Sequence, residues 1–281
     1  GSLPPRLPRN SWVLAAEMSR NDALYAGSAM VALSPGAAMI LLLAWRQPHV
    51  VVLHFLGAVG WLVSLLLLAI VWVSVPPLKE AWGWVTVMGS VVQELCRLGV
   101  VCLYFSLERH VEKRFSPTNQ RLPLNDFLAA LASGSGFASM HTLMQFGTII
   151  AATGTKSTLF TDACRDAPHV LVMSYTALVF WVLDVLLMFA AFSALRKGVR
   201  GAVPGVLVVF LIHVGMALTT LINLEDNGCV VSLPVLTAEV AVVVGYVLTF
   251  VRIYMPPRLE ASSSQAAPRT DRMELEQAHM T

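Results

Sequence analysis

Seven long apolar runs dominate this chain and decide its fold class. They cover residues 24–45, 50–75, 82–105, 127–152, 169–195, 202–223 and 229–254. Each run is about as long as a helix that crosses a bilayer, which takes ~20 residues. Separate apolar segments of this length satisfy their backbone polar groups in hydrocarbon only as helices. The alternating pattern of β-barrel strands does not occur in these runs. The sequence therefore predicts an all-α membrane protein with seven transmembrane helices.

Composition supports the same class and argues against two others. Of 281 residues, 56% are hydrophobic and only 13% are charged, and the mean hydropathy is +0.69. A soluble domain is not this apolar. The formal net charge is only +2, and we see no basic run interleaved with aromatic residues of the kind that single-strand binders carry. We therefore expect the lipid bilayer, and no nucleic acid, as a partner.

The polar ends of the chain set the domain limits. Residues 1–23 are polar and contain three prolines, and residues 255–281 are polar and serine-containing. Both ends are predicted to be disordered tails, the first lumenal and the second cytosolic, around one seven-helix domain at 24–254. No obvious cleavage site follows the first apolar run, so we interpret it as an uncleaved span.

Loop charges predict the orientation. The positive-inside rule places the loops richer in Lys and Arg in the cytosol. The first, third and fifth loops hold eight such residues, whereas the other three hold only Lys79, Lys156 and Arg165. The eight are Arg46, Arg109, Lys113, Arg114, Arg121, Arg196, Lys197 and Arg200. We therefore expect a lumenal or extracellular N-terminus and a cytosolic C-terminus.

Two of the four cysteines are candidates for a disulfide. Cys96 and Cys102 lie inside the third apolar run, where a thiol is usually a small apolar filler. Cys164 and Cys229 fall on the lumenal side of the predicted topology. Because that compartment is oxidising, a bond between these two is a hypothesis that the sequence supports.

A groove of small residues marks the fourth run. Ala130, Gly134, Ala138 and Thr142 recur every fourth position, which puts them on one face of a helix. Such a face lets a neighbouring helix bring its backbone close. The neighbour is either another subunit or another helix of the same chain, and the pattern leaves both open.

Polar residues at membrane depth are the next indication of function, because they are costly there. Gln93, Glu94 and Arg97 lie within one turn of the third run, and the last two are spaced for a local ion pair. This trio is either a structural clasp inside the bundle or part of a hydrated cavity that receives a ligand.

A second set of polar residues bears on whether the protein could be an enzyme. His141, Asp184, His213 and Glu239 lie in four different runs and include residue types that bind zinc or carry protons. No two share a helix at ligand spacing, and no HExxH accompanies them. An intramembrane aspartyl protease needs two facing Asp, whereas only Asp184 clearly lies inside the membrane. We expect no metal, no cofactor and no catalytic residue.

The ordered set of residues resembles a known family. It comprises LSPG at 33–36, WLVSLLL at 61–67, VW at 71–72, QE at 93–94 with Arg97, SG at 133–134, and His213 with LT at 218–219 and Asn223. In this order, across seven runs, these residues are similar to those of the anterior-pharynx-defective (Aph) subunits of gamma-secretase. The resemblance covers about residues 29–254 and leaves out both tails.

This resemblance implies a non-catalytic scaffold that stabilises an intramembrane protease. The expected partners are a presenilin-like aspartyl protease, a nicastrin-like glycoprotein and a presenilin-enhancer-like small subunit. The expected substrates are single-span membrane stubs, cut by the protease partner. The expected locations are membranes of the endoplasmic reticulum, the Golgi and the cell surface.

The resemblance also implies roles for individual residues. Gly134, Ala138 and Thr142 correspond to a glycine face that supports assembly, with only the first glycine kept. Gln93, Glu94, Arg97 and His213 correspond to polar residues that bear on partner binding, and they are expected to line a polar cavity for a partner's terminal segment. Asp184 stands where the family has a histidine in the fifth span. Because a lone Asp at that depth is costly, we predict that it pairs with His141.

Other seven-span classes fit the sequence less well. Glu108-Arg109-His110 mimics a G-protein-coupled receptor signature, but NPxxY and CWxP are absent from the seventh and sixth runs. A retinal protein needs a lysine in the seventh run for its Schiff base, and there is none. A metal-dependent lipid hydrolase of the ceramidase type needs clustered histidine ligands. The receptor and the hydrolase remain as alternatives.

Overall fold

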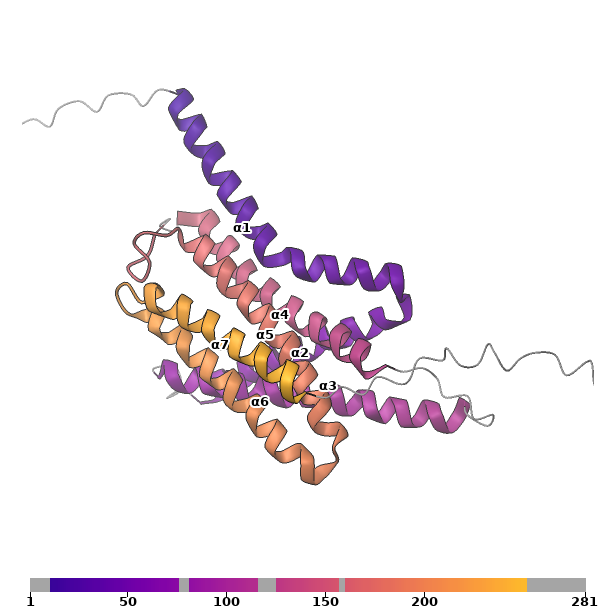
Figure 1. The fold of residues 1–281 in the computed structure, drawn as a ribbon. Helices are drawn as coiled ribbons and strands as arrows, with labels where there is room; N and C mark the ends of the chain where they lie inside the picture. Colours follow the sequence, from indigo (N-terminus) through magenta and orange to yellow (C-terminus); the bar gives the residue numbers. More distant parts are fainter. Residues whose placement is uncertain (1–10, 76–80, 116–124, 157–159, 252–281) are drawn as a thin grey trace, which may run out of the picture.

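The computed structural model describes residues 11–75, 81–115, 125–156 and 160–251. Seven long helices run through these segments, and no strand occurs in the part of the chain described (Figure 1). The helices are α1 (Ser11–Arg46), α2 (Val51–Ser74), α3 (Trp82–Phe115), α4 (Asp126–Lys156), α5 (His169–Arg196), α6 (Val199–Thr219) and α7 (Cys229–Phe250), with short 3₁₀ turns η1 (Pro48–Val50) and η3 (Thr220–Leu224). The all-helical class predicted from the sequence is confirmed.

Six of the seven helices are long and apolar enough to cross a membrane. The exception is α4, which has 31 residues and is therefore long enough. Its serines, glycines and other small or polar residues make it less apolar than the rest. That α4 also crosses the membrane stays a prediction, and so does the orientation of the termini.

The main difference from the expected boundaries lies in α1. This helix begins at Ser11, so the backbone from that residue onward is helical where the sequence analysis expects a disordered tail at 1–23. An apolar run marks the part of a helix that suits lipid, whereas the helical backbone can continue into polar sequence. Helix α1 bends about half-way along its length (Figure 1) and contains Pro35, whose ring disrupts the helical hydrogen-bond ladder. The expected disordered tail at 255–281 lies outside the described residues.

Helix α5 forms the centre of the bundle. In its most apolar stretch 72% of the residues are buried inside the chain, against 22–33% for the other five candidate spans. It packs against α1, α3, α4, α6 and α7. A helix that is apolar all round belongs in such a position, because its neighbours cover every face.

Two glycines bring α2 and α4 into direct backbone contact. A Cβ atom on Gly57 would overlap the carbonyl oxygen of Ser133, and one on Gly136 would overlap that of His54. Beside this contact His54 Nδ1 lies 3.0 Å from Ser135 Oγ. Close approach through residues without side chains supplies dispersion contacts in lipid, where helices gain little from the hydrophobic effect.

The small-residue face of α4 is buried against α5 of the same chain. Ala130 and Ala138 are fully buried, a Cβ on Gly134 would lie 2.9 Å from Met188 Cβ, and Thr142 Oγ1 donates to the carbonyl of Ala177 at 3.4 Å. The neighbour of this face in the structure is therefore another helix of the same chain. The direct contact with another subunit that the sequence analysis offered for this face is not available while α5 covers it.

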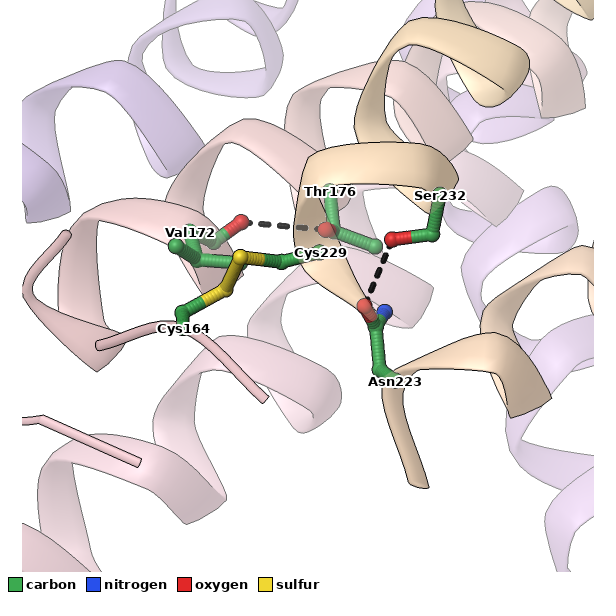
Figure 2. The surroundings of a disulfide bond; sticks show 6 residues. All are labelled: Cys164, Val172, Thr176, Asn223, Cys229 and Ser232. Carbon is green, nitrogen blue, oxygen red and sulfur yellow. Dashed lines mark hydrogen bonds between the residues drawn. A yellow bond between two sulfur atoms is a disulfide. The ribbon is translucent and has the colours of Figure 1, made fainter. Parts of the chain in front are cut away.

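A disulfide and nearby polar contacts fasten one end of the bundle. Cys164, in the α4–α5 loop, is bonded to Cys229 at the start of α7. Figure 2 shows this bond beside the Asn223 and Ser232 side chains, where Ser232 Oγ donates to Asn223 Oδ1 at 2.5 Å. The loop, η3 and α7 are thus tied together.

Candidate functional site: a buried ion cluster beside a polar cavity

Five ionisable residues from four helices form one continuous cluster in the middle of the bundle. They are Glu94 and Arg97 on α3, His141 on α4, Asp184 on α5 and His213 on α6, and we call them the ion cluster. The side chains of Glu94, Arg97 and Asp184 are completely buried. Charges at this depth persist only when they are paired and hydrogen-bonded.

Arg97 holds the ion cluster together. Its Nε donates to Glu94 Oε2 at 3.0 Å, its Nη2 donates to Asp184 Oδ1 at 2.5 Å, and its Nη1 donates to the Asp184 carbonyl at 2.7 Å. The guanidinium carbon also lies 4.3 Å from the centroid of the Phe137 ring, at a distance typical of cation–π contacts. The planar guanidinium thus joins α3 to α5 with its donors directed at fixed acceptors.

The two histidines extend the ion cluster at its ends. His213 Nδ1 lies 2.5 Å from Glu94 Oε1, and His141 Nδ1 lies 2.8 Å from Asp184 Oδ2. The His141 ring also stacks on Trp61, with centroids 5.2 Å apart. The pairing of His141 with Asp184 that the sequence analysis predicts is therefore present, although Asp184 is bound by Arg97 as well.

A polar cavity of about 390 Å³ adjoins the ion cluster. Residues of α2, α3, α4, α5, α6 and η3 line it. Its polar side chains are Thr86, Ser90, Gln93, His141, Gln145, Thr176, His213, Thr220 and Asn223. Both histidines of the ion cluster thus present a face to this space, and the amides of Gln93, Gln145 and Asn223 offer donors and acceptors to an occupant.

The polar cavity contains an amide oxygen without a partner. Gln145 Oε1 is buried and makes no hydrogen bond with any described residue. None of the described hydrogen bonds uses the side chain of Gln93, which lines the same space. An unpaired buried amide oxygen such as that of Gln145 costs free energy, about 1–3 kcal/mol by protein mutation. The cavity is therefore suited to an occupant with polar groups of its own.

The residues predicted from the sequence fall into four places. Gln93 and His213 line the polar cavity as expected. Glu94 and Arg97, which were expected there too, are instead fully buried in the ion cluster with Asp184 and do not belong to the lining. Gly134, Ala138 and Thr142 lie instead at the α4–α5 contact, and the Cys164–Cys229 bond lies at the end of the bundle.

Glu239 lies apart from the other members of the enzyme-like set, where it accepts a hydrogen bond from Thr219 at 2.9 Å. Among the described residues, no group of three or more His, Cys, Asp or Glu is placed to hold a metal ion. The set His141, Asp184, His213 and Glu239 therefore does not form one site. Three of its members join the ion cluster, where Asp184 contacts Arg97 and His141, and His213 contacts Glu94.

Sequence reasoning missed one residue that lines the cavity, Gln145, and one that stacks on the ion cluster, Trp61. Gln145 lies one turn after His141 on α4, and this i, i+4 spacing could have placed it on the same face. Trp61 begins the WLVSLLL stretch that resembles the family. Its stacking on His141 of α4 could not be predicted, because such a contact leaves no local pattern in the sequence.

Comparison with known proteins shows the family of the chain. The profile of the Aph-1 protein family matches residues 23–253, which is most of the chain and includes all members of the ion cluster. The chain is also 26% identical over 216 residues to a protein of Arabidopsis thaliana named gamma-secretase subunit APH1-like, an alignment that covers 75% of this chain and 85% of the relative. The chain belongs to the Aph-1 family.

Proposed function

We propose that this protein is a non-catalytic scaffold subunit of a gamma-secretase-type intramembrane protease complex. The name of the Arabidopsis relative supports such a complex, and membership of the Aph-1 family supports a subunit rather than the protease itself. The complex would contain a presenilin-like aspartyl protease, a nicastrin-like glycoprotein and a presenilin-enhancer-like small subunit. We place it in membranes of the endoplasmic reticulum, Golgi and cell surface, with its C-terminus in the cytosol.

The ion cluster supports a structural role. Each charged group in it already has a partner inside the chain, with Arg97 between Glu94 and Asp184 and a histidine at each end. Groups that are fully engaged in this way fix the relative positions of α3, α4, α5 and α6. They therefore serve as a rigid frame for the helices that surround the polar cavity.

The proposal rests on the polar cavity. It combines amides, hydroxyls and imidazoles at membrane depth, and it includes the unpartnered Gln145 Oε1. An extended peptide terminus supplies matching backbone donors and acceptors, and polar groups at this depth gain from such partners. We propose that the cavity holds a terminal segment of the presenilin-like partner, which Gln93, His141 and His213 contact.

The proposal is tested by purifying the tagged protein from its own cells in mild detergent and identifying its partners by mass spectrometry. Ala217→Trp should fill the polar cavity, which Ala217 lines. Val242→Trp is the matched control, because Val242 is 72% exposed on the outer surface of α7. Both variants are first checked for a monodisperse peak and an unchanged melting temperature, and Gln93→Leu replaces Ala217→Trp if the latter does not fold.

We expect the wild type and Val242→Trp to recover the presenilin-like and nicastrin-like subunits. The variant with the filled cavity should lose the presenilin-like subunit. Recovery of the protein alone, or with a G protein, from wild-type cells would contradict the scaffold function. Full recovery of the presenilin-like subunit with the folded cavity variant would contradict the role of the cavity.

A further inference from the structure

A second, larger hollow lies between α3 and α6, away from the polar cavity. It has a volume of about 840 Å³, within the range of about 300–1,000 Å³ usual for small-molecule sites. The end of α5 closes one side of it. We call it the α3–α6 groove, and its lining includes Phe105, Arg109, Arg196, Val203, Leu207 and Phe210.

The walls of the α3–α6 groove are apolar and continue into an exposed aliphatic surface. Val203 is 65% exposed and Leu207 is 56% exposed, and both line the groove on α6. Phe105 on α3 and Phe210 on α6 add aromatic surface. In a membrane-spanning bundle such a surface faces acyl chains, so the groove is suited to one chain of a lipid.

One end of the α3–α6 groove is charged, and its Arg196 is bound by two acids. Arg196 is paired with Glu108 at 2.7 Å and with Asp126 at 2.6 Å. It also lies over the Phe105 ring, 4.3 Å from the centroid. This guanidinium is therefore held in place by acids from α3 and α4.

Arg109 is the cation that this network leaves available. Its Nε donates to the Phe105 carbonyl of its own helix at 3.2 Å, and its Nη2 lies 3.5 Å from Ser106 Oγ. Among the residues whose side chains the structure describes, no carboxylate forms an ion pair with it. Lys197 follows Arg196 in the chain, so the described side chains around this end of the groove comprise three cations, Arg109, Arg196 and Lys197, and two acids, Glu108 and Asp126. This excess of positive charge favours an anion.

We propose that the α3–α6 groove binds an anionic phospholipid of the cytosolic leaflet. Its negatively charged headgroup meets Arg109, and one acyl chain lies against Val203, Leu207 and Phe210. The loop charges predict that this end of the bundle lies in the cytosol, where anionic lipids are concentrated and each Lys or Arg near the surface adds to the attraction. This site is separate from the polar cavity and does not depend on its occupant.

The test uses the full chain, purified with any subunits that accompany it, in phosphatidylcholine vesicles. The vesicles contain a trace of photoactivatable phosphatidylserine or of the matching photoactivatable phosphatidylcholine, with the reactive group on the acyl chain. Labelled peptides are identified by mass spectrometry. Arg109→Gln removes the cation, Leu207→Trp narrows the groove, and Arg165→Gln removes an exposed arginine at the opposite end as a control.

We expect phosphatidylserine to label peptides that contain Phe105 and Leu207 more strongly than phosphatidylcholine does. Arg109→Gln should lower the phosphatidylserine signal about fivefold, the effect of one cation at a membrane surface, and leave the phosphatidylcholine signal unchanged. Leu207→Trp should lower both signals, and Arg165→Gln neither. Equal labelling by the two lipids, labelling that maps to other helices, or an Arg109→Gln signal equal to wild type would overturn the proposal.

Discussion

Replacing Asp184 by Ala should destabilise the protein more than any exposed charge substitution. Asp184 accepts from Arg97 through Oδ1 at 2.5 Å and contacts His141 through Oδ2 at 2.8 Å, in a position with no solvent exposure. The variant leaves the buried guanidinium of Arg97 with Glu94 as its remaining acid partner. Removing one partner of a buried ion pair costs about 3–5 kcal/mol.

This loss is measurable as a lower melting temperature in a mild detergent. For a chain of this size, ~1 kcal/mol corresponds to about 2–4 °C, so the midpoint should fall by about 6–20 °C. Asp226→Ala is the matched control, because Asp226 pairs with Arg165 at 3.1 Å while their side chains are 71% and 57% exposed. An exposed pair contributes about 0–1 kcal/mol, so this control should melt within a few degrees of wild type.

A double-mutant cycle with His141→Ala separates the pair from the rest of the ion cluster. Because the two residues are in contact, the double variant should be less destabilised than the sum of the singles, by about 0.5–3 kcal/mol. The reasoning is refuted if Asp184→Ala melts like Asp226→Ala. Strict additivity with His141→Ala would refute the pairing alone.

Three further predictions concern the packing and the ends of the bundle. Gly134→Leu should lower the melting temperature sharply, because its Cβ would crowd Met188, whereas Gly147→Leu on the same helix meets nothing within 4 Å and should not. Reduction should change the gel mobility of the wild type but not of Cys164→Ser, and that variant should lose about 2–4 kcal/mol of unfolding free energy. Arg196→Ala should cost about 1–3 kcal/mol in thermal unfolding, because it leaves two carboxylates facing each other without their cation.

Helices and local pairs were accessible from the sequence because they depend on short spacings. Apolar runs located all seven helices, and the i, i+3 spacing of Glu94 and Arg97 predicted a pair that the structure has at 3.0 Å. The prediction that Asp184 pairs with His141 came from chemistry, since a carboxylate at membrane depth needs a partner.

The contacts between helices could not be predicted, because they depend on how far one helix is shifted along another. Arg97 and Asp184 are 87 residues apart, and no local pattern fixes their relative depth. Gly134 and Gly136 illustrate the same limit, because two positions along a helix turn by about 200° and face different neighbours. The first meets α5 and the second meets α2, and the sequence does not say which neighbour belongs to the same chain.

The most direct test of the scaffold account places a photoreactive amino acid at position 93 of the tagged protein in its own cells. Gln93 lines the polar cavity, so irradiation should attach a peptide from a terminus of the presenilin-like subunit. The same photoreactive residue at position 242, on the exposed surface of α7, serves as the control and should not capture that peptide. If position 93 captures no partner peptide, or captures the same peptides as position 242, the proposed role of the cavity is contradicted.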